Sequence, residues 1–89
     1  MYEWDEYKNL LNQKKHGISF EEAQKAFCDI NKTITEDDKH SDNEPRFYCL
    51  GKVDNKVVMV VFTVRSRNIR IISAGYWRQG KAKYDKQNS

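Results

Sequence analysis

The chain has 89 residues, 33% of them charged, and a formal net charge of +3 at pH 7. A chain of this length is expected to form one domain, residues 1–89, that buries about 60–65% of the surface of its unfolded state. The small positive charge permits binding of a polyanion without requiring it. The longest apolar run, residues 57–64, is too short to span a membrane, and the acidic N-terminus lacks the apolar segment of a secretion signal.

Cysteine usage and motif content argue against a metal site. Cys28 and Cys49 are too few for a disulfide scaffold, and their spacing matches no metal-binding motif. The sequence has no HExxH motif and no carboxylate cluster suited to Mg²⁺, so we expect neither a metal nor another cofactor. A reduced protein of the cytoplasm is the simplest interpretation.

The N-terminal region predicts a short edge strand over residues 1–4 and then a helix that begins at Asp5. Long and apolar side chains recur there at spacings of three and four, at Trp4, Tyr7, Leu10, Leu11 and Lys14. Basic residues 14–16 suit the C-terminal end of the helix dipole, and Gly17 suits the left-handed position that follows a helix. We expect this helix to turn its aromatic stripe toward a sheet.

A second helix is predicted directly afterwards. Ser19 and Glu22 have the spacing of a capping box, and Ile18 is placed for a hydrophobic staple. The helix should end near Asp29. Its expected buried stripe is Phe20, Ala23, Phe27 and Ile30.

The next stretch predicts a strand and a polar loop. Residues 32–36 alternate and are rich in β-branched side chains, whereas residues 37–45 are polar and contain the only proline. The loop carries His40 and Glu44 shortly before Arg46. These side chains could serve ion pairing or catalysis, although an ordinary solvated loop is the simpler alternative.

Residues 46–74 are the most apolar part of the chain and predict two β-hairpins that share a middle strand. Two-residue turns are expected at Asp54-Asn55 and Arg67-Asn68, since this is the commonest hairpin loop length and Asx residues favour it. Alternation of side chains then predicts one apolar face, covered by helices. Its members are Phe47, Cys49, Val58, Val60, Phe62, Val64, Ile69 and Ile71.

The opposite face is predicted to be apolar at one end, around Leu50 and Met59, and cationic at the other. The cationic end collects Arg46, Tyr48, Thr63, Arg65 and Arg70. The expected register sets Arg65 directly opposite Arg70, a like-charge pair that needs a compensating anion. Either loop carboxylates or solvent neutralise these arginines, or their guanidinium groups bind phosphate.

After the last strand, Gly75 precedes an aromatic segment and a frayed helix over residues 81–87, anchored by Tyr84. Tyr76 and Trp77 either stack on nucleic-acid bases or cover the apolar half of the second face, and covering is favoured. Together the elements predict an α+β fold. Two N-terminal helices pack on one face of a mostly antiparallel sheet, and a short helix ends the chain.

Several strings occur in one order along the sequence: Trp4-Asp5-Glu6, Lys8-Asn9, Asn12, residues 15–23, Phe27, Asp29, His40-Ser41, Glu44, Arg46, Leu50-Gly51, Val60, Thr63, Arg65 and residues 69–74. In this combination they resemble the BrnT toxins. The resemblance implies a RelE-like fold and a ribonuclease of a bacterial type II toxin–antitoxin pair. It also implies neutralisation by an antitoxin of the BrnA type in a hetero-oligomer, away from membranes.

Cleavage of RNA without a metal needs cations where charge accumulates on the phosphate, and groups that move protons. The candidate catalytic residues are Arg46, Arg65 and Arg70 as phosphate ligands, with His40 and Glu44 for proton transfer. The candidate RNA-binding residues are Tyr48, Arg67, Arg78 and Lys15. For Lys15 and for His16 beside it, a helix-capping role is favoured.

One position departs from the family, which usually continues Ser-Ala-Arg where this chain has Ser73-Ala74-Gly75. An arginine there would be a natural phosphate ligand, so either Arg78 substitutes for it or the protein is attenuated. Two other classes stay open. One is a nucleic-acid-binding module without catalysis, and the other is an interaction module that holds a partner helix.

Overall fold

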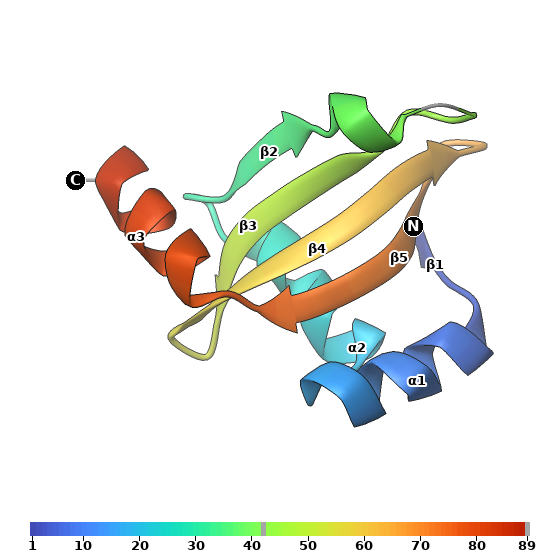
Figure 1. Cartoon of the computed structure of the whole chain (residues 1–89), viewed down its shortest axis with the longest axis horizontal. Helices are drawn as coiled ribbons and strands as arrows, with labels where there is room; N and C mark the ends of the chain where they lie inside the picture. Colours follow the sequence, from blue (N-terminus) through green and yellow to red (C-terminus); the bar gives the residue numbers. More distant parts are fainter. Residues whose placement is uncertain (42, 89) are drawn as a thin grey trace.

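The computed structural model describes residues 1–41 and 43–88, without the side chain of His40, and within them it has a five-stranded sheet and three α-helices (Figure 1). The strands are β1 (Tyr2–Glu3), β2 (Thr33–Glu36), β3 (Phe47–Val53), β4 (Lys56–Arg65) and β5 (Asn68–Tyr76). The helices are α1 (Glu6–His16), α2 (Phe20–Ala23) and α3 (Arg78–Gln87), with 3-10 segments η1 (Gln24–Cys28) and η2 (Asp38–His40). The predicted α+β fold is confirmed.

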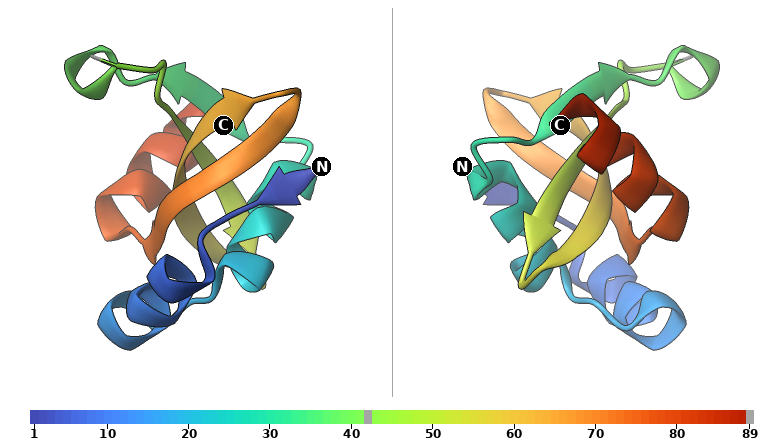
Figure 2. Two further views of the ribbon diagram at one scale, coloured as in Figure 1. Left: turned by 90° about the vertical axis from the view of Figure 1, so that its right-hand side faces the viewer. Right: turned by 90° about the vertical axis from the view of Figure 1, so that its left-hand side faces the viewer.

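The strand order is β1-β5-β4-β3-β2, and every neighbouring pair is antiparallel except β1 with β5. The edge strand predicted near the N-terminus is therefore present, and it runs parallel to β5. Figure 2 shows α2 and η1 on one side of the sheet and α3 at one end of the other side, while α1 lies beside β5. The layered arrangement leaves part of the second face without a helix over it.

The core lies between the sheet and the α2–η1 segment. Ser19 caps α2, because its Oγ accepts a hydrogen bond from the backbone N–H of Glu22. A Cβ at Gly51 would overlap the carbonyl of Ala26, so glycine lets η1 approach β3 closely. The buried residues of this cluster are Ile18, Phe20, Ala23, Ala26, Phe27, Cys49, Val53, Val58, Val60, Phe62, Ile71 and Ala74.

Two parts of the predicted buried set are wrong. Ile30 is 92% exposed, because the helical segment ends at Cys28 and the chain turns away. Val64 is also exposed, because it lies at the end of β4 beyond the helices. The remainder of the predicted apolar face does face α2 and η1.

Of the stripe predicted for the first helix, Trp4 packs against the core as expected, but the prediction for the inward face of α1 itself is wrong. Tyr7, Leu10 and Leu11 are exposed, and the buried residues of α1 are Asn9 and Asn12. The physical reason is that α1 lies against backbone groups rather than against apolar side chains. Asn9 Oδ1 accepts a hydrogen bond from the backbone N–H of Phe20, and Asn12 Nδ2 donates to the carbonyl of Ile18.

The first hairpin turn is confirmed at Asp54-Asn55, where both residues have positive φ. The second turn is formed by Ser66 and Arg67, with φ of 49° and 69°, and not by Arg67-Asn68. Arg65 therefore pairs with Asn68, and Arg70 pairs with Thr63. The predicted cross-strand pair of Arg65 with Arg70 is wrong. The assignment of side chains to faces survives near the turn, because the pairing differs by two residues.

A β-bulge further along β5 reverses the faces. Phe62 pairs with Ile71 but Val61 pairs with Ser73, so Ile72 is the extra residue. Ala74 is consequently buried with the core, and Gly75 lies opposite Met59 on the second face. The bulge thus sets which β5 residues face α1 and the open surface.

The second face is covered at one end by α3. Leu50, Val57 and Tyr84 form a small buried cluster, against which Tyr48, Met59 and Trp77 pack. The favoured covering role is confirmed for Trp77, whereas Tyr76 is 48% exposed. The predicted anchor Tyr84 is 4% exposed, and its hydroxyl donates to Asp29. The remainder of this side of the sheet, from Arg46 and Arg70 to Gly75, is called the open face below.

Candidate active site

One end of the open face holds the predicted arginines together with two carboxylates, and we call this group the arginine corner: Glu3, Glu44, Arg46, Arg65 and Arg70. Arg65 donates to Glu44 through Nε at 3.0 Å and through Nη2 at 3.1 Å. Arg70 Nη1 donates to Glu3 Oε2 at 2.8 Å. The alternative of neutralisation by carboxylates therefore describes Arg65 and Arg70, with one partner from the loop and the other from β1.

The carboxylates of the corner are held in their ionised form. Hydrogen bonds from Arg65 lower the pKa of Glu44 below its usual range, and Arg46 and Arg70 add to the effect. Hydrogen bonds from Arg70 and Asn68 likewise lower the pKa of Glu3. An ionised carboxylate in such pairs is a weak proton acceptor. This geometry suits Glu44 to orienting the guanidinium of Arg65.

Arg46 differs from its two neighbours. Its backbone is fixed at the end of the loop, because its N–H donates to Ser41 Oγ and its carbonyl accepts from the N–H of Asp37. Among the described residues, no carboxylate forms an ion pair with its guanidinium group. With three arginines and two carboxylates, the corner keeps one unit of positive charge.

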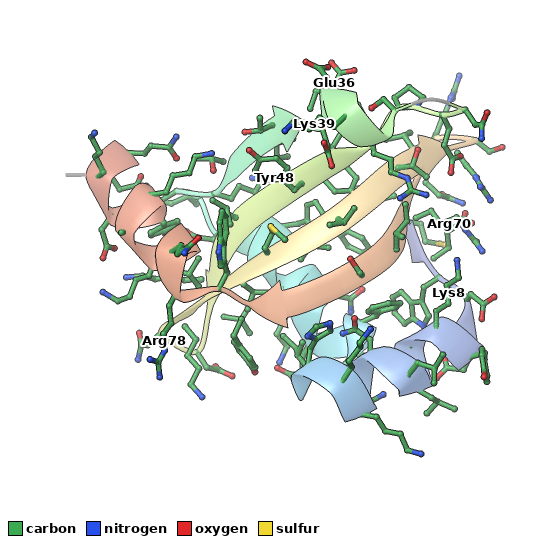
Figure 3. The ribbon with its side chains drawn as sticks, viewed as in Figure 1. Lys8, Glu36, Lys39, Tyr48, Arg70 and Arg78 are labelled. Atoms are coloured by element: carbon green, nitrogen blue, oxygen red, sulfur yellow. The ribbon has the colours of Figure 1, made fainter. Side chains whose placement is uncertain are left out.

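The remaining candidates are spread over the sheet. Tyr48 is the second residue of β3, and its hydroxyl accepts a hydrogen bond from Lys83 of α3 at 3.2 Å. Arg67 lies in the exposed β4–β5 turn, near the arginine corner. Arg78 begins α3 at the opposite end of the sheet from Arg70 (Figure 3). The side chain of His40 lies outside the described part of the structure.

Lys15, at the end of α1, lines a second cationic region, which we call the α1–β5 groove. The groove consists of two adjoining hollows of about 170 and 200 Å³. His16 and Ser73 line both hollows. Lys8 and Lys15 line the second hollow, and Trp77 lines the first.

His16 is a residue that sequence reasoning passed over as a helix cap. A Cβ built on Gly75 would lie 3.7 Å from His16 Cγ, so the imidazole stands over the end of β5. Only the place of His16 within the string of residues 15–23 could have drawn attention to it. The helical pattern itself gave no signal, because a basic residue in the last turn is ordinary.

The family model described as the ribonuclease toxin BrnT of type II toxin–antitoxin systems matches residues 4–80. The chain belongs to the BrnT family. The match extends from Trp4, two residues before α1, into the first residues of α3. It includes the α1–β5 groove and every residue of the arginine corner except Glu3. No curated protein matches the sequence.

Membership of the BrnT family confirms the resemblance seen in the sequence and implies an antitoxin partner. Within the described residues, no three His, Cys, Asp or Glu side chains gather closely enough to hold a metal ion. No helix in the same part of the chain is long and apolar enough to cross a membrane. Burial raises the pKa of the Cys49 thiol to about 12, so this cysteine is not poised to act as a nucleophile.

Proposed function

We propose that this chain is an endoribonuclease toxin that cleaves RNA on the open face without a metal. The observation that carries the proposal is the BrnT match over residues 4–80 of a chain whose open face is lined by cations. Those cations come from the arginine corner at one end and from α1 along the edge of β5. Such a surface suits the phosphates of a single strand.

The chemistry uses the substrate's own nucleophile. The 2′-hydroxyl loses its proton and its oxygen attacks the adjacent phosphorus, while the bond from phosphorus to O5′ breaks. The products are a 2′,3′-cyclic phosphate and a 5′-hydroxyl end, once O5′ has taken up a proton. Negative charge grows on the non-bridging oxygens during this step, and fixed cations beside them lower the barrier.

In this proposal Arg46, Arg65 and Arg70 hold phosphate. Arg46 is the first ligand, because no described carboxylate competes for it. Glu44 keeps Arg65 in place through two hydrogen bonds, and His40 is retained as a proton-transfer candidate from the loop. Tyr48, Arg67 and Lys15 extend the RNA path away from the corner, and Arg78 contributes at the far end.

Neutralisation by a cognate antitoxin of the BrnA type, in a toxin–antitoxin hetero-oligomer, completes the proposal. It is supported by the family to which the chain belongs. The test is induction of the chain in bacterial cells, with and without the neighbouring open reading frame. We expect growth arrest that the neighbour relieves. Normal growth under strong expression, with the protein shown to be soluble and folded, would contradict the toxin assignment.

One alternative is favoured by a specific observation. Because Arg65 and Arg70 already carry carboxylate partners, the open face could bind nucleic acid without cleaving it. The two functions differ in the response to substitutions of proton-transfer residues. Loss of cleavage with retained RNA binding in His40→Ala would support the enzyme, whereas Glu44→Ala releases Arg65 and is expected to weaken binding as well.

A further inference from the structure

We propose that the α1–β5 groove is the cleavage subsite for a single-stranded RNA dinucleotide, with His16 as the group that accepts the 2′-hydroxyl proton. This inference rests on the proposed ribonuclease function and names the place where the reaction occurs. The arginine corner then holds a neighbouring phosphate of the same strand.

The charges that line the groove favour a phosphate. Lys8 and Lys15 line the groove, and no Asp or Glu is among the described residues that line its two hollows. In the arginine corner, by contrast, carboxylates already occupy two of the three guanidinium groups. An incoming phosphate therefore competes with no carboxylate among the described residues of the groove, whereas at Arg65 and Arg70 it must compete with a bound carboxylate.

Cationic side chains connect the groove with the arginine corner. Lys8 and Lys15 are seven residues apart on one face of α1, which corresponds to about 10.5 Å along the helix. Figure 3 shows Lys8 at the same end of the sheet as Arg70, so the cations run from the corner along the edge of β5. Arg70 and Ser73 are separated by about 10 Å of strand. One strand of RNA can therefore contact both regions.

His16 lies between a side chain that can hold a base and side chains that can hold a phosphate. Its imidazole lines both hollows, and neutral imidazole is the side chain best suited to proton transfer near pH 7. Trp77, which packs against the cluster covered by α3, also lines the hollow on one side of His16, where the remaining surface of the half-buried indole can stack on a base. The lysines line the hollow on the other side. A nucleotide with its base on Trp77 and its 3′-phosphate toward Lys15 brings its 2′-hydroxyl to His16.

Hydrogen bonds hold the end of α1, and with it His16, in a fixed place on β5. Asn12 hydrogen-bonds both backbone groups of Ala74 and so fixes the last turn of α1 against β5. Gly75 presents no side chain between the imidazole and the sheet. In the reaction, His16 takes the proton from the 2′-hydroxyl, O2′ bonds to phosphorus, and the departing O5′ takes a proton from water. The two hollows, of about 170 and 200 Å³, together reach the lower end of the range for ligand sites, which begins at roughly 300 Å³.

The test compares His16→Gln and Lys15→Gln with Lys14→Gln, a matched control that lines a different hollow with Tyr7 and Leu10. We expect His16→Gln to slow single-turnover cleavage by about 10²-fold or more while binding of a 2′-O-methyl RNA oligonucleotide changes little. Lys15→Gln should weaken that binding, and Lys14→Gln should change neither quantity. Added imidazole should restore part of the cleavage in His16→Ala, which a purely structural role would not allow.

Three outcomes would overturn the inference: undiminished cleavage by His16→Gln, an equal loss of binding and cleavage in that variant, or no imidazole rescue. A wild-type chain that fails to cleave RNA contradicts the proposed function instead. In that case the subsite is tested by the NMR signals of the His16 ring during addition of a 2′-O-methyl dinucleotide. Signals that shift support the subsite, and signals that stay in place overturn it.

Discussion

The side-chain amide of Asn12 forms two hydrogen bonds with the backbone of Ala74: Nδ2 donates to the carbonyl at 2.9 Å, and Oδ1 accepts from the N–H at 3.2 Å. The amide therefore continues the sheet beyond β5 with a side chain from α1. This contact lies one residue before Gly75 and one helical turn before His16, so it determines how the α1–β5 groove is built.

Replacing Asn12 with Ala should lower the free energy of unfolding by about 1–3 kcal/mol, because it leaves buried backbone groups of Ala74 without partners. Leu10→Ala is the matched control in the same helix. Leu10 is 56% exposed, so its truncation should change stability by no more than about 0.5 kcal/mol. Urea unfolding of both variants decides the matter, and a larger loss for Leu10→Ala would show that α1 packs through its apolar stripe.

Asp29 accepts hydrogen bonds from Tyr84 of α3, Lys52 of β3 and Asn31 of the turn before β2. Its contribution to the free energy of unfolding should depend on pH. Burial alone would raise the pKa of Asp29, but hydrogen bonds from Tyr84 and from the backbone N–H groups of Lys52 and Asn31 outweigh burial and lower it. For a carboxyl whose pKa is lower in the folded state, the stabilisation is complete above the unfolded-state pKa, about 3.9 for Asp, and is lost as the pH falls through the folded-state pKa.

We therefore expect Asp29→Asn to cost about 1.5–3 kcal/mol near neutral pH, and the difference from the wild type to shrink steadily below about pH 4. Urea unfolding at several pH values measures this difference. A difference that stays constant down to pH 2.5 would be inconsistent with an ionised Asp29 in the folded state.

The arginine corner should matter for cleavage more than for folding. If the reacting phosphate lies at the corner, changing Arg46, Arg65 or Arg70 singly to Ala should reduce RNA cleavage on the order of 10²-fold, as for the loss of one fixed donor to a developing anion. If the corner holds only the neighbouring phosphate of the strand, the loss should appear mainly in RNA binding. For Arg65→Ala stability should change little, since its ion pair with Glu44 lies at the surface. Lys25→Ala, which breaks a surface ion pair on η1, serves as the control. Unchanged cleavage in all three variants would remove the corner from the phosphate path.

Gly75→Arg should strengthen cleavage and toxicity if the chain is attenuated. Gly75 is in the regular part of β5 without a left-handed φ, and a side chain there meets the His16 ring at ordinary contact distance. The added guanidinium would bring positive charge to the groove, where we place the reacting phosphate. Toxicity and cleavage assays of the variant test this. An inert Gly75→Arg combined with loss of activity in Arg78→Ala would assign the role to Arg78, which lies by the β3–β4 turn.

Most of the fold could be predicted because its signals are local. The Asp54-Asn55 turn, the cap at Ser19 and the left-handed Gly17 each depend on a few neighbouring residues, and all three are present. The second turn was misplaced because Asn68 is the better turn residue in isolation, whereas in the fold its side chain bonds to Glu3 of β1. That partner is distant in sequence.

Local signals were also insufficient to predict the partners of the candidate site residues. The alternation of side chains placed the three arginines on one face, and the loop with Glu44 was predicted as a possible source of ion-pair partners. Glu3, the partner of Arg70, comes from β1, whose pairing with β5 no local pattern reveals. The bulge at Ile72 has no signal in the local pattern, and it places Gly75 on the second face, where it lies against His16. The sequence alone therefore did not predict the groove, because its lining residues come together only in the folded chain.

We propose above all that this chain cleaves RNA through the 2′-hydroxyl of its substrate. The most direct measurement is incubation of the purified chain with a single-stranded RNA oligonucleotide in excess EDTA, followed by analysis of the new ends. We expect 2′,3′-cyclic phosphate and 5′-hydroxyl ends, and no cleavage at a nucleotide that carries a 2′-deoxy sugar. Ends that bear a 5′-phosphate, cleavage that needs an added divalent metal, or intact RNA with both the wild type and Gly75→Arg would contradict the claim.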